Sequence, residues 1–388
     1  MNYILFDGPY RNNLLPFTFT RPVADLRIGI TTIREKWEYY LGKVSTKTEE
    51  YLQQKWPLET KEKNCFVHAA VLPSEELISK VRTLTHHQVL LVGDEVIAFS
   101  AERFTEDYSN FEKIELTKEA FTVKHTWDIF SKNGDAIKDD FNRLTAGRLS
   151  QVIPDYIHAR NPEHIFIEHG AQVNVCVLNA EDGPIYIGKD ALIMDGSTIK
   201  GPFALGEHGV VKMGAKIYGP TTAGPYCKIG GEINNSVLFG YSSKGHDGFM
   251  GNSVIGEWCN WGADTNNSNL KNNYAEVRLW NYEKKGFDRT GLQFCGLMMG
   301  DHSKCGINTM FNTGTVVGVS ANIYGGGFPR NFIPSFSWGG ASGMTTYRTN
   351  KAFETAEKVM ERRDLSFGDD EKAILSHVFE LTKEWRKD

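Results

Sequence analysis

The chain has 388 residues, with 43 Lys and Arg against 48 Asp and Glu, which gives a formal net charge of -5 at pH 7. This length predicts two or three domains, and a hydrophobic fraction of 40% is enough for a sizeable core. Nucleic-acid-binding proteins typically carry an excess of positive charge, whereas the net charge of this chain is negative. Nucleic acid is therefore not an expected partner.

The cysteines and the N-terminal residues indicate the cellular compartment in which the protein is expected. The cysteines are widely spaced, without a CxxC pair: Cys65, Cys176, Cys227, Cys259, Cys295 and Cys305. This spacing disfavours a zinc site or a disulfide framework and is typical of a protein in the reducing cytosol. The N-terminal apolar run ends at Asp7, and no stretch reaches roughly 18 apolar residues. We therefore expect a cytoplasmic protein without a membrane partner.

Residues 1–155 show the pattern of an α/β domain. Short apolar runs at Tyr3–Phe6 and Val89–Val92 predict buried strands, and residues 31–41 predict a helix with one apolar face. Pro154 and Pro162 bracket the joint to the next domain.

A six-residue period begins after the joint and predicts a parallel β-helix over residues 156–340. The period is carried by Ile187, Ile193, Ile199, Leu205, Val211, Ile217 and Ile229, and later by Met299, Cys305, Phe311, Val317 and Ile323. Each short strand turns one such residue inward, so that neighbouring coils bury a continuous apolar column. The register breaks near Asn235 and is expected to resume at Phe249.

Two further segments depart from this period. Residues 275–289 are charged and aromatic, and we expect them to loop out from one coil. Residues 341–388 change to helical spacing, and we expect them to form a C-terminal helical cap that covers the open end of the solenoid or packs against a neighbouring subunit.

The opening of the chain resembles sugar-phosphate nucleotidyltransferases. The run LLPFTFTRP at residues 14–22, followed by Gly29–Ile33, is similar to the signature of that family. Most loop glycines that would cradle a triphosphate are missing, and the lysine expected after proline is Val23. The resemblance therefore implies a divergent nucleotidyltransferase-like domain.

Candidate nucleotide-site residues follow from this resemblance. Arg11, Arg21 and Arg27 are candidate cationic clamps for phosphate, although arginines beside strands commonly serve as salt-bridge partners. Asp25 is a further nucleotide-site candidate. Asp94 follows a buried strand, as the Mg²⁺-binding aspartate does in that family, but Gly-Asp is equally an ordinary turn.

His246 lies where the six-residue register breaks, and glycines flank it. We expect its imidazole to project from the coil, and histidine is the residue type most often used as a general base. A single histidine is more often a surface or packing residue, so the surrounding pattern decides between the two interpretations.

That surrounding pattern resembles the acetyltransferase half of the bifunctional enzymes that make UDP-N-acetylglucosamine. The resemblance places His246 on the catalytic base, Phe249 and Asn260 on sugar contacts, Ala263 on an acetyl-CoA contact and Asn269 on the asparagine near the thioester. Four of these five positions agree or nearly agree with the family.

The resemblance is weaker at the sugar-phosphate position and in one glycine motif. Asn234 occupies the place of a phosphate-binding lysine, and Asp264 replaces a glycine. Lys228, Lys244 and Lys271 are the nearby candidates to replace that positive charge.

Taken together, the resemblance implies a divergent nucleotidyltransferase domain followed by a left-handed parallel β-helix acyltransferase domain. It implies acetyl-CoA as cosubstrate, Mg²⁺ for nucleotidyl transfer, and a homotrimer that acts on a sugar phosphate and a nucleotide. Two alternatives remain open: nucleotidyl transfer to a hexose 1-phosphate alone, or a non-catalytic protein that binds sugar nucleotides or acts in assembly.

Overall fold

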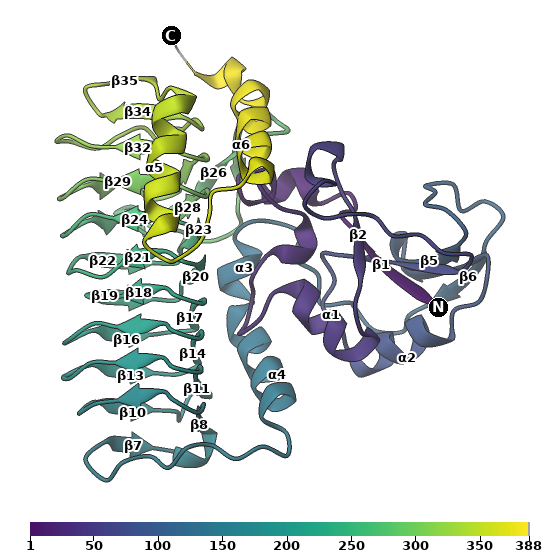
Figure 1. The fold of residues 1–388 in the computed structure, drawn as a ribbon, viewed down its shortest axis with the longest axis horizontal. Helices are drawn as coiled ribbons and strands as arrows, with labels where there is room; N and C mark the ends of the chain where they lie inside the picture. The colour runs from purple at the N-terminus through teal and green to yellow at the C-terminus, as the bar shows by residue number, and fades with distance from the viewer. Residues whose placement is uncertain (387–388) are drawn as a thin grey trace.

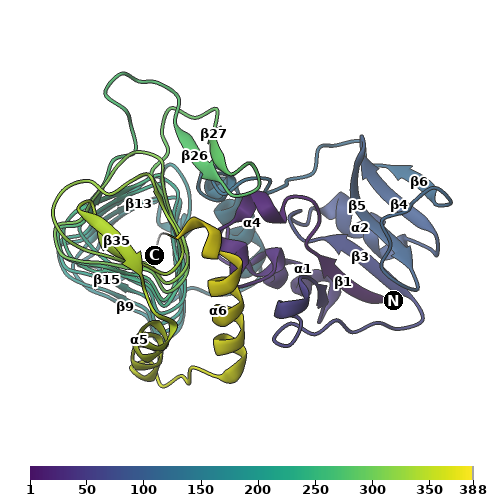
Figure 2. The same ribbon diagram turned by 90° about the horizontal axis from the view of Figure 1, so that it is seen from above.

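The computed structural model describes residues 1–386 and consists of an α/β domain beside a parallel β-solenoid (Figure 1). Two C-terminal helices accompany the solenoid. Seen from above in Figure 2, the coils of the solenoid stack over one another, and the α/β domain lies to one side of the stack. The predicted fold class is therefore confirmed.

The α/β domain is built on one six-stranded sheet with the order β2-β1-β3-β5-β4-β6. β1 is parallel to β2 and β3, whereas β5 is antiparallel to β3 and β4. Parallel strands buried on both faces read as continuous apolar runs, which is why β1 and β4 were recognisable in the sequence. The strands are β1 (Asn2–Phe6), β2 (Ser45–Lys47), β3 (Asn64–His68), β4 (Gln88–Val92), β5 (Glu95–Ala101) and β6 (Glu112–Glu115).

Short helices connect and cover this sheet. The predicted first helix begins at Ile33, because the Thr32 hydroxyl accepts from the Glu35 amide while the Glu35 carboxylate accepts from the Thr32 amide. The helices are α1 (Ile33–Leu41), α2 (Glu75–Thr83), α3 (Asp128–Ser131) and α4 (Asn133–Thr145), and 3-10 turns occupy Arg11–Leu14, Phe17–Phe19, Val23–Asp25 and Glu50–Leu52.

Three long parallel sheets form the walls of the solenoid. The first sheet contains β7 (His158–Arg160), β10 (Val177–Asn179), β13 (Thr198–Lys200), β16 (Lys216–Tyr218), β19 (Glu232–Asn234) and β22 (Phe249–Gly251), and the pair β25 (Asn266–Asn267) and β30 (Met310–Phe311) lies beyond it. The second sheet contains β8 (Ile165–Ile167), β11 (Ile185–Ile187), β14 (Phe203–Leu205), β17 (Thr221–Ala223), β20 (Val237–Gly240), β23 (Val254–Glu257), β28 (Leu297–Met299), β31 (Thr315–Val317) and β33 (Phe332–Ile333).

The third sheet completes each coil before the chain returns to the first sheet. It contains β9 (Gln172–Val173), β12 (Leu192–Ile193), β15 (Val210–Val211), β18 (Lys228–Ile229), β21 (Ser243–Lys244), β24 (Asn260–Trp261), β29 (Lys304–Cys305), β32 (Asn322–Ile323), β34 (Ser337–Gly340) and β35 (Gly343–Thr346). β34 and β35 form an antiparallel hairpin at the last coil.

The residues of the six-residue period point inward as predicted. Ile199 and Val211 are fully buried, and so are Ile187, Leu205 and Ile229. At the register break one expectation was wrong, because Met250 rather than Phe249 lies under Ile233 in the core column. In the third sheet, Lys244 pairs with Ile229 and occupies a core position of the shortened coil.

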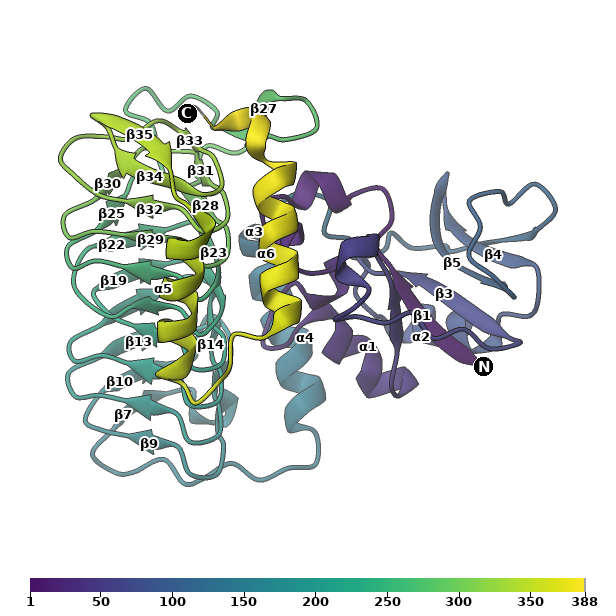
Figure 3. The same cartoon turned by 45° about the horizontal axis from the view of Figure 1, so that its top comes forward.

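The two segments outside the period have distinct positions. The charged insertion forms the antiparallel hairpin β26 (Arg278–Asn281) and β27 (Gly286–Arg289), as expected for a segment that loops out from a coil. The helices α5 (Thr349–Glu361) and α6 (Asp369–Leu381) run beside the coils, and Figure 3 shows α6 between the solenoid and the α/β domain. No helix among residues 1–386 has the length and apolar character needed to cross a membrane.

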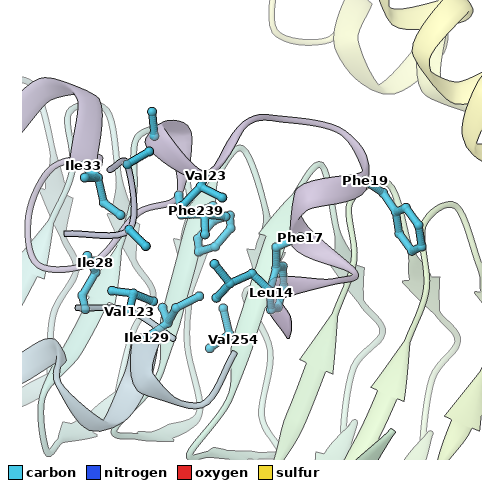
Figure 4. Close-up of a cluster of buried hydrophobic side chains, with 14 of the residues drawn as sticks. Leu14, Phe17, Phe19, Val23, Ile28, Ile33, Val123, Ile129, Phe239 and Val254 are labelled. Atoms are coloured by element: carbon cyan, nitrogen blue, oxygen red, sulfur yellow. The ribbon is translucent and has the colours of Figure 1, made fainter. Parts of the chain in front are cut away.

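The α/β domain docks on the second solenoid sheet through a shared apolar core (Figure 4). Phe17 packs against Phe239 with ring centroids 5.2 Å apart. Polar contacts reinforce this seam: the Arg27 Nε donates to the Phe239 carbonyl at 2.7 Å, and the Thr222 hydroxyl donates to the Gly29 carbonyl at 2.9 Å. The two domains therefore form one continuous packed unit.

Candidate functional site

A cleft of about 900 Å³ opens at one edge of the α/β sheet. It lies at the carboxyl ends of the parallel strands β1 and β2, where ligands commonly bind in open α/β sheets, and it includes the turn from β4 to β5. Its lining residues are Phe6, Asp7, Gly8, Pro9, Tyr10, Arg11, Asn12, Lys47, Thr48, Glu49, Glu50, Asp94, Glu95, Val96, Phe104, Glu106 and Tyr108.

Asp7 lies directly after β1, on the floor of the cleft. Its carboxylate accepts hydrogen bonds from the Val23 amide at 2.7 Å and from the Thr48 hydroxyl, and the Arg11 Nε is 3.3 Å away. Burial raises the pKa of Asp7 to about 6, although these three partners act in the opposite direction. Asp7 is therefore a carboxyl group that can exchange a proton near neutral pH.

His68 lies beneath the cleft at the end of β3 and is fully buried. Its ring stacks on Phe6 and Tyr10, and neither ring nitrogen has a hydrogen-bond partner. A Cβ at Gly8, where φ is +60°, would lie 2.1 Å from the His68 Nε2, so the chain can pass over this ring only with glycine. Burial lowers the pKa of His68 to about 4.

The charge of the cleft is mainly negative. Its acidic lining residues are Asp7, Glu49, Glu50, Asp94, Glu95 and Glu106, against the basic residues Arg11 and Lys47. Lys124 adds a cation at the rim, 2.8 Å from Glu95. Among residues 1–386, no group of three or more His, Cys, Asp and Glu side chains is arranged to hold a metal ion.

The predicted nucleotide-site residues fall into two groups. Arg11 and Asp94 line the cleft, and the Arg11 guanidinium also donates to the Thr18 carbonyl and the Tyr51 hydroxyl. The other three lie elsewhere: Arg27 contacts Phe239 and Ile30, Asp25 holds Arg34 at 2.7 and 2.9 Å, and Arg21 binds Asp301 and Glu257 of the solenoid.

Arg21 and its partners join the two domains. The Arg21 side chain is 7% exposed and pairs with Asp301, and it also pairs with Glu257 at 3.1 Å. Burial opposes its charged form, but these two carboxylates raise the pKa of Arg21 above its ordinary value. The Thr20 hydroxyl donates to the same Asp301 carboxylate at 2.6 Å.

The second candidate site is the turn from β21 to β22, which carries His246. The His246 side chain is exposed, as expected, and the turn packs tightly on neighbouring coils. A Cβ at Gly231 would lie 2.8 Å from the His246 carbonyl oxygen, and on the other side the Asp264 amide donates to the Asp247 carbonyl at 3.0 Å. Inside the coil, the Lys244 Nζ donates to the His246 carbonyl at 2.5 Å.

The other residues predicted around His246 lie on adjacent coils. The ring of Phe249 and the amide of Asn269 both cover Gly251, where a Cβ would lie 2.6 Å from each. Ala263 lies in the equivalent turn of the next coil, beside Asp264, and Asn260 is exposed on β24. The structure thus brings Phe249 of β22 and Asn269, which follows β25, together over Gly251, and it places Ala263 on the same edge as His246.

The three candidate lysines have different environments. Lys244 is 2% exposed, and burial lowers its pKa to about 8. Lys271 donates to the Glu276 carbonyl within the inserted loop. Lys228 is partly exposed on the outer face of β18.

The His246 turn lies between the third and the first solenoid sheets, whereas the α/β domain covers the second sheet. In a three-walled solenoid, the edge between the first and third walls is opposite the second wall. The N-terminal cleft and the His246 turn therefore lie on different sides of the molecule.

The exposed apolar side chains Val175, Met213 and Ile307 lie in equivalent turns along the His246 edge.

Sequence reasoning missed three residues of the N-terminal cleft: Asp7, His68 and Glu95. The signal for Asp7 was its position directly after the β1 run. His68 ends β3, which the sequence analysis did not identify, so only the pairing of β3 with β1 brings it beside the Gly8 loop.

Part of the chain is similar to known proteins. Residues 3–149 match the family model described as sugar nucleotidyl transferase. This N-terminal region is therefore similar to the family that its opening motif resembles.

Three curated relatives cover parts of the chain. A bifunctional sugar-1-phosphate nucleotidylyltransferase/acetyltransferase of Sulfurisphaera tokodaii is 37% identical over 155 residues, which are 38% of this chain and 38% of that protein. A bifunctional protein GlmU of Methanocaldococcus jannaschii is 32% identical over 87 residues, 22% of this chain and 21% of that protein. Its counterpart in Methanococcus maripaludis is 30% identical over 92 residues, 24% of this chain and 22% of that protein.

The chain thus spans less than half the length of the curated relatives it matches. The matched family and the bifunctional relative from Sulfurisphaera tokodaii are both named as transferases, as the sequence resemblance implied.

Proposed function

We propose that this chain is a two-domain enzyme of sugar-nucleotide synthesis. Its solenoid transfers an acetyl group to an amino-sugar phosphate, and its α/β domain transfers a nucleotidyl group to a sugar 1-phosphate. The observation that carries the proposal is the exposed His246 on a turn held from three sides, with Phe249 and Asn269 together beside Gly251 of the following strand. The name of the relative from Sulfurisphaera tokodaii, which includes both a nucleotidylyltransferase and an acetyltransferase, supports both proposed reactions.

In the acetyl transfer, His246 acts as the general base. It accepts a proton from the sugar amine as the amine nitrogen attacks the thioester carbonyl of acetyl-CoA. The carbon–sulfur bond then breaks, and CoA leaves as the thiol after taking up a proton. Asn269 and backbone N–H groups stabilise the oxyanion, and Phe249, Asn260 and Ala263 shape the site.

In the nucleotidyl transfer, a sugar 1-phosphate oxygen attacks the α-phosphorus of a nucleoside triphosphate, and pyrophosphate leaves. Mg²⁺ is typically held by one or two carboxylates together with the phosphates, a role that fits Asp94 at the edge of the acidic cleft. When bound, it would neutralise phosphate charge. Arg11, whose Nε lies 3.3 Å from the Asp7 carboxylate, is a cation beside the loop that follows β1.

The active form of the solenoid is a homotrimer. Val175, Met213 and Ile307 are 56%, 67% and 71% exposed in separate turns along the His246 edge, and a second solenoid packed on this edge would cover them. In such an assembly a neighbouring solenoid covers this edge, and acetyl-CoA lies between the two.

The acetyl transfer is tested with His246→Ala. We expect turnover with acetyl-CoA and glucosamine 1-phosphate to fall by about 10²-fold or more, with unfolding unchanged. His169→Ala, at another exposed histidine of the solenoid, is the matched control and should keep full activity. Unchanged turnover in His246→Ala would remove this mechanism.

The nucleotidyl transfer needs a separate assay of pyrophosphate release with each nucleoside triphosphate and Mg²⁺. We expect Asp94→Asn to abolish the release and to leave acetyl transfer intact. A wild-type protein that releases no pyrophosphate with any nucleotide would restrict the proposal to the solenoid. If neither reaction occurs, the chain is a non-catalytic binding protein.

A further inference from the structure

Four cations gather on the outer face of the third solenoid sheet, beside the His246 turn. We call them the basic cluster: Lys212, Lys228, Arg362 and Arg363. Two come from neighbouring coils, and two follow α5, which runs along this side of the solenoid in Figures 1 and 3. Residues far apart in the sequence therefore converge on one place.

The two lysines lie side by side. A Cβ at Gly230 would lie 3.0 Å from the Cβ of Lys212, so this glycine leaves room for the lysine stem. A Cβ at Gly245 would lie 3.7 Å from the Cγ of Lys212 and 4.0 Å from the Cβ of Lys228. Because Gly245 directly precedes His246, both stems lie next to the turn that carries the proposed base.

The two arginines follow the end of α5, and Arg363 is held near Lys228. The Arg363 guanidinium donates to the Tyr226 carbonyl at 3.3 Å, two residues before Lys228 in the same coil. The positive charges of Arg363, Lys212 and Arg362 all act on the Lys228 ammonium. Burial first, and then these three charges, lower the pKa of Lys228.

None of the ion pairs formed within residues 1–386 includes a member of the basic cluster. Other cations nearby are paired: Lys358 with Glu361 at 2.9 Å, and Lys351 with Glu354 at 2.9 Å. Like charges held together without a carboxylate cost free energy, and the matching counterion for such a cluster is a multivalent anion.

We propose that the basic cluster is a phosphate-binding site that serves the His246 centre. An arginine guanidinium can donate two hydrogen bonds to phosphate oxygens, and a lysine ammonium acts as a point charge. The cluster therefore has both kinds of phosphate-binding group. The two reactants of the proposed acetyl transfer both carry phosphate, on the sugar and on CoA, and the cluster holds one of these groups. This identification of the ligand rests on the proposed function, whereas phosphate binding itself does not.

Binding is measured first with inorganic phosphate and pyrophosphate, at constant ionic strength, by thermal unfolding. An anion that binds only the folded protein raises its melting temperature by mass action. We expect both anions to raise it in the wild type, and the rise to disappear in the double variant Lys228→Gln with Arg362→Gln. Without anion, this variant should melt no lower than the wild type, because a repulsion has been removed.

The matched control removes two paired cations from the same helix, as Lys351→Gln with Lys358→Gln. It lowers the net charge equally and should keep the phosphate response of the wild type. A control that loses the response to the same extent would mean that only the overall charge matters, and would overturn the proposal.

Calorimetry then distinguishes the two sources of phosphate. If the cluster holds CoA, the wild type should bind CoA about tenfold more tightly than dephospho-CoA, and the double variant should bind both alike. If it holds the sugar, affinity for glucosamine 1-phosphate should fall about tenfold or more while CoA binding is unchanged.

Equal binding of phosphate, CoA and the sugar phosphate by the wild type and the double variant would overturn the inference. Failure of the proposed function has a different result. In that case no acetyl transfer is seen with the wild type, yet the double variant still loses phosphate or CoA binding.

Discussion

At the scale of single residues, Lys244 is the most unusual member of the solenoid core. It stands in a column of aliphatic and aromatic residues, and its Nζ donates to the His246 carbonyl. A buried ammonium is costly unless it is well paired, which is why its pKa falls from 10.5 to about 8. We interpret the lysine as an internal support of the His246 turn.

Lys244→Met tests this interpretation, because methionine keeps the apolar stem and removes the charge. The variant should be more stable than the wild type at pH 7 by about 1 to 3 kcal/mol, measured by denaturant unfolding. Between pH 8 and 10.5 the unfolded lysine binds more protons than the folded one, so wild-type stability rises with pH and the difference shrinks.

Acetyl transfer by Lys244→Met should fall, since the His246 carbonyl loses its partner. Ile229→Met, at the neighbouring position of the same column, is the control and should keep its activity. A Lys244→Met protein that is less stable across the whole pH range would contradict the buried-charge interpretation.

The buried His68 predicts a second pH dependence of stability, in the acidic range. Its pKa is lowered from 6.5 to about 4, so the unfolded chain binds a proton in this range that the folded protein does not. The contribution of the neutral His68 side chain to the free energy of unfolding is therefore complete above pH 6.5, and it is lost as the pH falls toward 4.

His68→Phe keeps the ring stacking on Phe6 and Tyr10 and cannot be protonated. The stability of this variant relative to the wild type should therefore increase by roughly 3 kcal/mol between pH 7 and pH 4, measured by urea unfolding at each pH. A pH-independent difference would show that His68 does not titrate in this range. The rise in the pKa of Asp7 cancels in this comparison, because both proteins contain Asp7.

These residues also show where sequence reasoning ended. The spacing indicated that His246 leaves the core, because glycines flank it at the register break. It could not place Lys244, since the coil is shortened there and a lysine at a core position looks identical to a surface lysine in the sequence. Because the coil is shortened, the six-residue spacing also assigned the core position to Phe249, whereas Met250 occupies it.

At the scale of elements, the six-residue register makes a sharp prediction. Ile199 is fully buried in β13, whereas its neighbour Lys200 is exposed and pairs with Asp182 at 2.6 Å. Ile199→Asp would bury an unpaired carboxylate and should cost about 3 to 5 kcal/mol of unfolding free energy. Lys200→Gln should cost less than about 1 kcal/mol. Equal costs at the two positions would contradict the inward register.

The elements differed in how well their sequence predicted them. Periodicity identified the coils, and the break in periodicity identified the β26–β27 insertion, because both are local patterns. The same pattern predicted two C-terminal helices, but it placed them over the open end of the solenoid or against a neighbouring subunit and did not indicate the α/β domain as a partner. α6 packs toward the α/β domain, where His377 stacks on Tyr51 at 4.1 Å and Glu371 pairs with Lys55 at 3.0 Å.

At the scale of the whole molecule, the contact of Arg21 with Asp301 holds the two domains together. Both side chains are more than nine-tenths buried. Arg21→Met leaves the Asp301 carboxylate without its cation, and we expect a loss of about 3 to 5 kcal/mol in denaturant unfolding. The double variant with Asp301→Asn should recover part of this loss, because the buried charge is then gone.

Arg148→Met is the control for that experiment, since Arg148 forms an ion pair with Glu168 but is 47% exposed. It should cost at most about 1 kcal/mol. Equal losses at Arg21 and Arg148 would show that the buried pair does not stabilise the seam. The sequence suggested Arg21 as a phosphate ligand because it lies in the signature run, and only the docking of the domains reveals its carboxylate partners.

The shared apolar core has a consequence for how the protein is made. The ribosome delivers the segment around Phe17 and Ile28 first, but the residues that cover it, Phe239 and Val254, emerge roughly 210 to 240 residues later. At about 5 to 20 residues per second, this delay is on the order of 10 to 50 s. The first part of the α/β domain is therefore synthesised long before the middle coils that form the wall against which it packs, and this packing has to wait for those coils.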